Sequence, residues 1–263
     1  MIKVLFFGDI VGKIGRDMFF AQLPELKKKF KPDLVIINGE NSANGKGITS
    51  KIYHSYLQAG VDCVTSGNHI FDNKEILPLI DEYEALIRPA NYPVSVPGNV
   101  VYKKVIKGTK IAVVNFLGQV FMPPVDNPFH VFESMLNTVL KDSSLIIADI
   151  HAEATSEKMA FAYNYTGKLS AVCGTHTHIQ TSDAQILGEH TAYITDLGMI
   201  GAKHSILGMA PESIINRFIT YMPERIAPPE TDEEVVMDYV FMEFDTSGKA
   251  CNIESFHNIL EVE

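Results

Sequence analysis

The chain has 263 residues, 46% of them hydrophobic, with a formal net charge of −10 and a pI near 5.4. This composition supports one large α/β domain or two small ones and excludes the disordered class. Because an acidic surface repels a phosphate backbone, we expect no extended nucleic-acid groove, although a small anionic substrate would fit if metal supplied positive charge. No apolar stretch reaches the ~20 residues of a membrane span. Three widely spaced cysteines without a CxxC pair, and no signal peptide, favour a reducing cytoplasm.

The first part of the chain alternates short apolar runs with amphipathic segments. We expect strands at 2–8, 33–38 and 61–66, and helices at 14–30, from Thr49 or Ser50 to about 60, and at 73–82. The apolar runs are rich in β-branched residues and lack polar alternation. This pattern is typical of strands buried on both faces, as in parallel sheets.

The remainder of the chain predicts a mixture of hairpins and βα units. The ranges are 100–106 with 111–116 (hairpin), 129–141 (helix), 145–150 (strand), 156–165 (helix), 169–174 (strand), 184–187 with 191–195 (hairpin), and 235–245 with 249–259 (two long strands). We therefore expect an α/β fold with a sheet core, parallel in the middle and antiparallel toward the edges. No linker divides it, so we expect a single domain over 1–263, in which the Gly-, Met- and Pro-rich segment 197–232 forms a lid with one helix near 212–221.

Five apolar runs each stop at a residue that binds metal well, and this is the most informative pattern in the sequence. The residues at these ends are Asp9, Glu40, Asn68, His151, and the pair His176 and His178. In open parallel sheets, ligands bind beyond the carboxyl ends of the strands. We therefore expect these side chains to meet at one sheet edge, where their oxygen and nitrogen atoms are enough for two metal ions.

A two-metal site needs a carboxylate that bridges the ions, and Glu40 is our candidate. The expected further ligands of one ion are Asp9, Asn41 and His178. Those of the other are Asn68, His151 and His176. Mixed imidazole, carboxylate and amide donors suit Fe, Mn, Co or Zn better than Mg or Ca.

Two motifs carry additional detail. In the segment Gly174–His178, the two histidines at i and i+2 of an extended chain lie on the same face, so that they converge on one cluster. Gly67 allows a tight turn before Asn68 and His69. His69, beside the metals, would protonate the leaving oxygen or hold a phosphoryl oxygen, with Asp72 orienting its ring. The alternative is a loop histidine followed by an N-capping aspartate.

Together these motifs resemble the calcineurin-like metallophosphoesterase superfamily, whose pattern is an Asp after the first strand, a GD block, a GNH block, a lone His and a terminal GHxH. The corresponding residues are Gly8-Asp9, Gly39-Glu40-Asn41, Gly67-Asn68-His69, His151 and Gly174-Thr175-His176-Thr177-His178. Three departures stand out. Val11 replaces a histidine, Glu40 replaces the bridging aspartate, and one residue is inserted before His176.

All three departures resemble one bacterial branch, the YmdB-type phosphodiesterases. That resemblance implies a four-layer α/β/β/α sandwich with the metal site at the C-terminal ends of the parallel strands. It implies a dinuclear centre, with iron favoured and manganese as the alternative. It also implies hydrolysis of 2′,3′-cyclic or 3′,5′-cyclic nucleotides by attack of a metal-activated hydroxide on phosphorus. With Val11, the first ion has fewer protein ligands than usual.

Other functions stay open at this point. A phosphomonoesterase or a nuclease would use the same metal centre with a different pocket rim. An amidohydrolase barrel also carries HxH, but after its first strand, and the hairpins argue against eight βα units. A cyclic-nucleotide sensor without turnover is a third alternative. Met and Phe residues in 116–132 belong to the core or form a contact between identical subunits.

Overall fold

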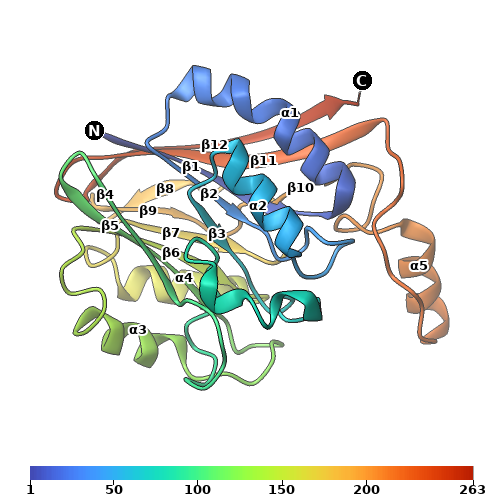
Figure 1. Ribbon diagram of the computed structural model, residues 1–263, viewed down its shortest axis with the longest axis horizontal. Helices are drawn as coiled ribbons and strands as arrows, with labels where there is room; N and C mark the ends of the chain where they lie inside the picture. Colours follow the sequence, from blue (N-terminus) through green and yellow to red (C-terminus); the bar gives the residue numbers. More distant parts are fainter. Residues whose placement is uncertain (263) are drawn as a thin grey trace.

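The computed structural model describes residues 1–262, which form two six-stranded sheets (Figure 1). The first sheet contains β1 (Ile2–Ile10), β2 (Leu34–Asn38), β3 (Cys63–Thr65), β10 (Met199–Ala202), β11 (Glu234–Phe244) and β12 (Ala250–Glu261), in the order β12-β11-β10-β1-β2-β3. The second contains β4 (Val101–Ile106), β5 (Thr109–Leu117), β6 (Leu145–His151), β7 (Ala171–Thr175), β8 (Gln185–Leu187) and β9 (Thr191–Ile194), in the order β4-β5-β6-β7-β9-β8.

Parallel pairing dominates the interior of both sheets, as expected. In the first sheet, β1 lies parallel to β2 and β10, and β11 and β12 form an antiparallel edge. In the second, β5, β6, β7 and β9 are parallel to one another, and the antiparallel pairs β4–β5 and β8–β9 lie at the two edges. The C-terminal ends of β1, β2 and β3 and of β6 and β7 are therefore available to build a common site.

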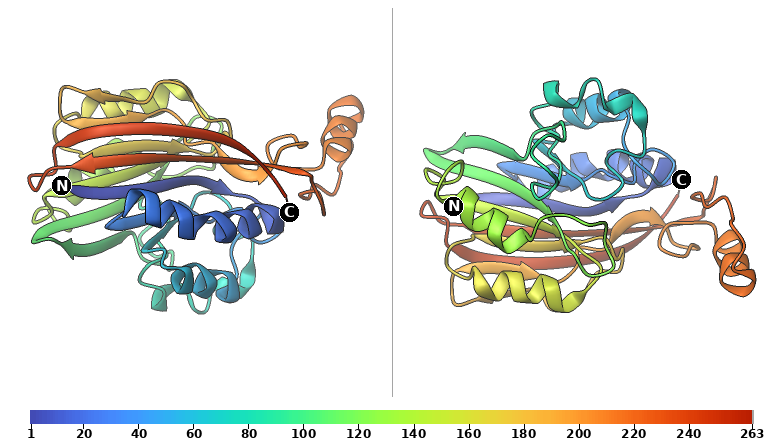
Figure 2. Two further views of the ribbon diagram at one scale, coloured as in Figure 1. Left: turned by 90° about the horizontal axis from the view of Figure 1, so that it is seen from above. Right: turned by 90° about the horizontal axis from the view of Figure 1, so that it is seen from below.

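Helices cover the outer face of each sheet. Helices α1 (Gly12–Phe30) and α2 (Ser50–Ala59) lie over the first sheet, and α3 (Pro128–Leu136) and α4 (Thr155–Asn164) lie over the second (Figure 2). A further apolar core separates the two sheets. The order of layers is α/β/β/α, which confirms the four-layer sandwich. Helix α5 (Pro211–Thr220) projects beyond the layers at one end (Figure 1).

Side chains of β1 show why its sequence lacks polar alternation. Leu5 and Phe7 pack toward α1 and α2, whereas Val4 and Phe6 pack into the core between the sheets, and all four are fully buried. Successive strand residues face opposite sides, so a strand between two apolar layers needs apolar residues at both.

Some elements differ from the sequence prediction. The expected helix at 73–82 is two 3₁₀ turns, η1 (Lys74–Ile76) and η2 (Ile80–Glu82), because Pro78 lies between them and cannot continue a helix. Helix α3 ends at Leu136 rather than at 141. There Asn137 Nδ2 donates to the Glu133 carbonyl, which satisfies a terminal backbone group locally.

The segment 197–232 is only partly outside the sheets. Strand β10 lies within it and pairs with β1 and β11, and its four residues, one of them Gly201, give a weak strand signal. Residues 203–232 remain outside, including α5, which has no buried residue. The single domain and the movement of this segment as a lid stay predictions.

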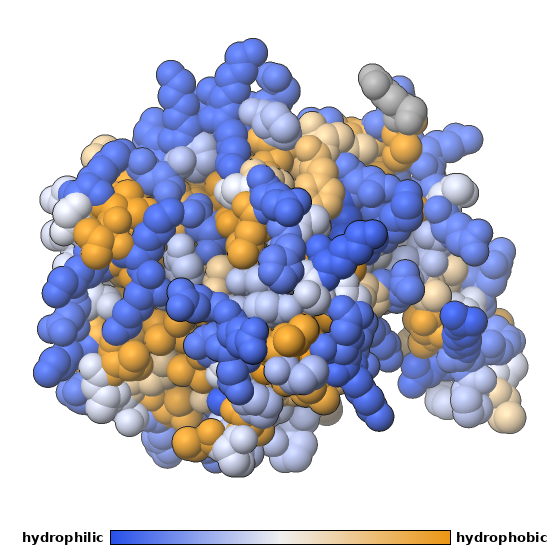
Figure 3. All heavy atoms as spheres, viewed as in Figure 1, coloured by the Kyte–Doolittle hydropathy of each residue, from blue (hydrophilic) through white to orange (hydrophobic). Residues whose placement is uncertain are grey.

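The surface bears on two further expectations. Phe116 and Phe132 belong to the core under α3 and α4, whereas Phe121 is exposed, and a contact between identical subunits stays a prediction. Hydrophilic and apolar residues are interspersed on the face in Figure 3, with apolar side chains visible over α5. No helix within residues 1–262 is both long and apolar enough to span a membrane.

Candidate metal centre

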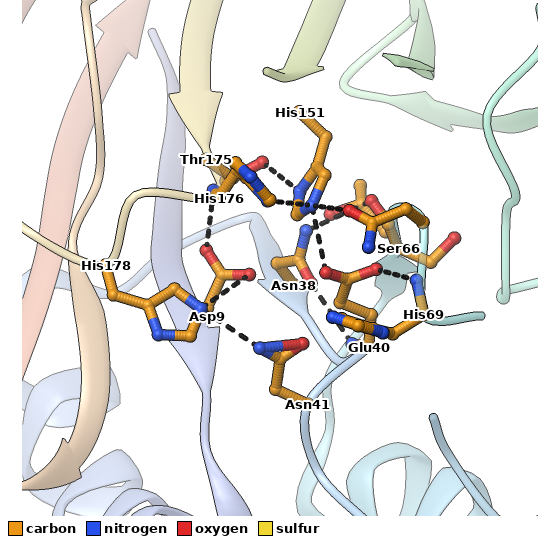
Figure 4. Close-up of polar contacts among 12 residues, drawn as sticks. Asp9, Asn38, Glu40, Asn41, Ser66, His69, His151, Thr175, His176 and His178 are labelled. Carbon is orange, nitrogen blue, oxygen red and sulfur yellow. Dashed lines mark hydrogen bonds and ion pairs between the residues drawn. The ribbon is translucent and has the colours of Figure 1, made fainter. Parts of the chain in front are cut away.

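All seven predicted ligand residues meet where strands of both sheets end (Figure 4). The first sheet supplies the oxygen donors: Asp9 is in β1, Glu40 and Asn41 follow β2, and Asn68 follows β3. The second sheet supplies the imidazoles: His151 ends β6, and His176 and His178 follow β7. The expectation of one sheet edge was therefore wrong. The side chains converge because the carboxyl ends of two packed sheets lie together.

Asp9, Asn41 and His178 form one group. The Nε2 atom of His178 lies 3.6 Å from Asp9 Oδ1 and 3.0 Å from Asn41 Nδ2. The other ring nitrogen of His178, Nδ1, donates to the carbonyl of Leu207 at 2.9 Å. In a neutral ring this bond places the proton on Nδ1, so that the Nε2 lone pair is directed toward Asp9 and Asn41.

Two oxygen atoms in this group have no hydrogen-bond partner within the described chain. They are Asp9 Oδ1 and Asn41 Oδ1, and both are buried. Buried polar atoms are rarely unsatisfied, and two of them beside an imidazole lone pair fit a bound cation. Burial alone would raise the pKa of Asp9, but the neighbouring His178 and His151 lower it to about 2, so the carboxylate is ionised.

Glu40, Asn68, His151 and His176 form the second group around a single atom, His151 Nε2. This nitrogen lies 2.9 Å from Glu40 Oε1, 3.2 Å from Asn68 Oδ1 and 3.1 Å from His176 Nδ1. The ligand atoms of Glu40, His151 and His176 all lie within 4.8 Å of one another. One proton on Nε2 cannot serve three acceptors at once, whereas a cation among these atoms could be bound by all of them.

The charges of this group perturb the titration of both histidines. Burial would lower the pKa of His151, but the Glu40 carboxylate, with Asp9 and Asp149, raises it to about 9. Burial and the nearby His151 together lower the pKa of His176 to about 3. Without metal, therefore, His151 holds a proton where a cation would bind.

Each of the three histidines also has an outward-facing nitrogen close to an oxygen. For His178 this is the Leu207 carbonyl described above. For His151, Nδ1 lies 2.9 Å from Thr175 Oγ1, and for His176, Nε2 lies 3.2 Å from Glu153 Oε2. Metal-binding histidines typically direct the second nitrogen to such a partner, which fixes the tautomer and the ring orientation.

Asp149 is a functional candidate that the sequence analysis missed. It is fully buried, and it accepts hydrogen bonds from Thr175 Oγ1 at 2.6 Å, Thr65 Oγ1 at 2.5 Å and Asn38 Nδ2 at 3.3 Å. Burial raises its pKa to about 7, against the opposing influence of His151 and the hydroxyl donors. Because the Thr175 hydroxyl donates to Asp149, its lone pair faces His151 Nδ1. A carboxylate inside the otherwise apolar run LIIADI was the signal available.

The i, i+2 spacing predicted an extended segment for His176 and His178. The loop that carries them is not extended, so this expectation was wrong. Both residues have positive φ values, 96° and 63°, which are unusual for non-glycine residues and concentrate at functional sites. As a result the two rings reach different groups of ligands. Between them, Thr177 donates to Asp196 Oδ2 through its backbone N–H and its hydroxyl.

The Gly67-Asn68-His69 turn lies against the second group. Gly67 does not have a positive φ, so the expected reason for glycine was wrong. A Cβ atom there would collide with the His151 ring and Glu40 Oε2. The backbone N–H of His69 donates to Glu40 Oε2 at 2.8 Å, and its Nδ1 lies 2.8 Å from Asp72 Oδ2, so Asp72 does contact the ring as expected.

A cavity of about 450 Å³ opens onto the centre. Its inner side is lined by Glu40, Asn41, His69, His176 and His178. Its outer side is lined by Ile206, Leu207, Met209, Ile214, Arg217 and Phe218. The site is therefore accessible to a small molecule, with polar and apolar walls facing each other.

The family model for YmdB-like proteins matches residues 5–256. The chain belongs to the YmdB-like family. The 2′,3′-cyclic-nucleotide 2′-phosphodiesterase of Bacillus subtilis (strain 168) is 47% identical to this YmdB-like chain over 256 residues, 96% of each protein. This relationship confirms the expected enzyme class, a phosphodiesterase, and the expected family.

Solved structures confirm the fold. The crystal structure of a novel phosphatase from Mycoplasma pneumoniae matches with a TM-score of 0.92 and 35% identity, and the match covers 99% of this chain and 94% of the other. A putative 5′-nucleotidase from Staphylococcus aureus matches with a TM-score of 0.60 and 14% identity over 99% of this chain and 54% of its own. The second likeness concerns the fold alone.

Proposed function

We propose that the protein hydrolyses nucleoside cyclic phosphates at a dinuclear transition-metal centre. The observation that carries this proposal is the orientation of three imidazoles, each with one nitrogen directed into a cluster of buried oxygen atoms and the other close to an outer oxygen. In addition, the buried oxygens Asp9 Oδ1 and Asn41 Oδ1 accept no hydrogen bond within the described chain, and a bound cation would satisfy both. The full set of proposed ligands is Asp9, Glu40, Asn41, Asn68, His151, His176 and His178.

The donor set suits the first-row metals Fe, Mn, Co and Zn, and among these the family resemblance favours iron, with manganese as the alternative. It combines two carboxylates, two amides and three imidazoles, a mixture that borderline first-row metals accept and that Mg²⁺ or Ca²⁺ do not favour. Asp9, Asn41 and His178 would hold one ion, and Asn68, His151 and His176 the other.

Glu40 is proposed to hold both ions. It is 1% exposed, and its Oε1 faces His151 while its Oε2 faces the backbone of His69. Burial would raise the pKa of the Glu40 carboxyl, but the neighbouring His151 lowers it below its ordinary value, which keeps the carboxylate charged for cation binding. Bound metal ions would supply positive charge for the phosphate and activate the attacking water.

The chain itself contributes a proton donor and a means of orienting it. His69 lines the cavity, and its Nδ1 is fixed by Asp72, which leaves Nε2 free to face a substrate. We propose that His69 protonates the leaving ester oxygen. The Asp72 carboxylate would keep the ring oriented.

The substrate follows from the named relative. The Bacillus subtilis protein is a 2′,3′-cyclic-nucleotide 2′-phosphodiesterase, and nearly the whole of both chains aligns. We therefore propose 2′,3′-cyclic nucleotides as the leading substrates and 3′,5′-cyclic nucleotides as the second class. A phosphomonoester substrate is the competing proposal, because the Mycoplasma pneumoniae relative is described as a phosphatase.

The test combines metal analysis with a substrate panel. Protein loaded with iron or manganese is assayed with 2′,3′-cyclic AMP, 3′,5′-cyclic AMP, a linear dinucleotide and 3′-AMP. We expect two ions per chain and turnover of a cyclic diester ahead of the monoester. Glu40→Gln should fold but lose turnover, because the bridge loses its charge, whereas Glu133→Gln, an exposed glutamate on α3, should behave as wild type. Monoester cleavage alone, or activity without metal, would contradict the proposal.

A further inference from the structure

We propose that the outer wall of the cavity is a nucleoside subsite, in which Phe218 stacks on the nucleobase and Arg217 pairs with a phosphate oxygen of the substrate. This inference rests on the proposed function, since it assigns the part of the substrate that the metal centre does not hold. The wall is the segment Ile206–Phe218, which runs from the end of β10 into α5.

The chemistry of the cavity is divided between its two sides. On the metal side, polar ligands and His69 surround the place where a phosphate would bind. On the opposite side, apolar side chains predominate, and Arg217 is the one residue there with a full positive charge. A nucleoside cyclic phosphate has a similar division, with an anionic diester at one end and, at the other, a flat aromatic base whose ring faces can stack on apolar side chains. The cavity of about 450 Å³ lies in the usual range for a ligand of this size.

The helix itself indicates that something other than the protein core covers this wall. Ile214, Arg217 and Phe218 lie at positions i, i+3 and i+4 of α5, which places them on neighbouring positions of one face. No residue of α5 is buried, and Phe218 is 74% exposed. Within residues 1–262 the Arg217 guanidinium makes no hydrogen bond or ion pair, so it is available to an anion. An aromatic and an arginine side by side at a metal-site cavity fit a base and a phosphate.

The wall is fixed to the metal centre at its base. The carbonyl of Leu207 accepts the Nδ1 hydrogen bond of His178, so the metal ligand and the wall are linked by a 2.9 Å contact. Next to it, the backbone at Gly208 packs directly on Val11, since a Cβ at Gly208 would collide with the valine side chain. The residue that stands in place of a usual metal-binding histidine therefore supports the segment that carries the subsite.

Phe218 and Arg217 are expected to bind different parts of the substrate, so two substrates that differ in the nucleoside can test the two roles separately. The substrates are 2′,3′-cyclic AMP and glycerol 1,2-cyclic phosphate, which has the same five-membered cyclic diester without ribose or base. Phe218→Ala should raise KM for the nucleotide about 5- to 10-fold, the lower range for a stacked base because Phe218 is largely exposed. It should leave kcat for the nucleotide, and both constants for the glycerol substrate, unchanged. Phe218→Tyr should retain wild-type KM.

Arg217→Gln should raise KM for both substrates by a similar factor, because both carry the diester. Ile219→Ala is the matched control for the phenylalanine. Ile219 is also 74% exposed on α5, but it does not line the cavity, and its replacement should change neither substrate. Adenosine should inhibit cleavage of the glycerol substrate by the wild type, and this inhibition should weaken in Phe218→Ala, a binding readout independent of nucleotide turnover.

The outcomes separate this inference from the proposed function. If the wild type cleaves both cyclic phosphates but Phe218→Ala changes nucleotide KM no more than Ile219→Ala does, the subsite is overturned and the enzyme class stands. An equal loss for both substrates in Phe218→Ala would also overturn it, because the ring would then support the helix rather than bind a base. If the wild type cleaves neither cyclic phosphate, the proposed function fails and the subsite fails with it.

Discussion

The loop that carries two of the proposed metal ligands is anchored by a buried ion pair, and replacing its lysine gives a quantitative prediction. Lys158 in α4 donates to Asp196 Oδ2 at 2.6 Å, and the two side chains are 1% and 0% exposed. The same oxygen accepts from the backbone N–H and the hydroxyl of Thr177, between His176 and His178. Lys158→Met removes the cation and retains an apolar side chain of similar length.

The expected cost follows from the charge that remains. Removing one partner of a buried pair typically costs about 3–5 kcal/mol, because the other charge stays buried without compensation. Asp196 would keep the two Thr177 hydrogen bonds and one from the backbone of Gly198 at 2.9 Å. These bonds offset part of the penalty, and methionine refills most of the volume. We therefore expect the free energy of unfolding to fall by about 3 kcal/mol.

Urea unfolding of metal-free protein measures this directly, and the chain offers a matched control. Lys168 pairs with Glu133 at 3.4 Å with both side chains about half exposed, so Lys168→Met should cost at most about 1 kcal/mol. Lys158→Met should also weaken metal binding, because Thr177 would be less firmly placed. A cost for Lys158→Met within 1 kcal/mol of the control would show that Asp196 does not carry a buried, uncompensated charge in the variant.

Three further predictions concern the centre itself. His69→Ala should retain both metals while the rate falls roughly 10²–10⁴-fold, the range for loss of a general acid. As a control, replacement of the exposed His54 by alanine should have no effect on the rate. Metal loss in His69→Ala would instead make His69 a ligand. Glu153→Gln should lower metal affinity about 10- to 100-fold in a competition titration, because the partner of His176 Nε2 loses its charge, and an unchanged affinity would remove Glu153 from the site. Because the pKa of His151 is raised to about 9 without metal, the ring is protonated below that pH and must release its proton to bind metal, so affinity should fall as pH decreases. Calorimetry at pH 7–8 in buffers of different ionisation enthalpy would detect the proton, and heats independent of the buffer would contradict this assignment.

The sequence predicted that the candidate ligands would lie together, but it placed them in the wrong setting. The ends of the apolar runs predicted Asp9, Glu40 and His151 as ligands, because strand ends in parallel sheets have a fixed relation to the site. The same reasoning placed them on one sheet, since the pattern of a buried strand does not say which sheet the strand joins. It also missed Asp149, because a carboxylate within a strand becomes informative only when its partners Thr175 and Thr65 are known to surround it.

Local signals had a similar limit. We expected glycine at position 67 because it allows a tight backbone turn. The structure gives another reason, since the His151 ring and Glu40 occupy the space that a Cβ atom would need. The i, i+2 spacing of His176 and His178 predicted convergence from an extended chain, and the chain instead bends through two positive φ values. In both cases the residue is fixed by neighbours distant in sequence.

The amino-acid sequence by itself determined the alternation of strands and helices, the donor residues at the strand ends and the family that they indicate, because hydrophobic periodicity and strand ends are local properties of the chain. Only the tertiary structure decided that two sheets, rather than one, bring the donors together. It also decided which nitrogen of each histidine faces the centre, and that α5 supplies the far wall of the cavity. Those features depend on contacts between segments separated by tens to more than a hundred residues, and only the packing of the layers establishes them.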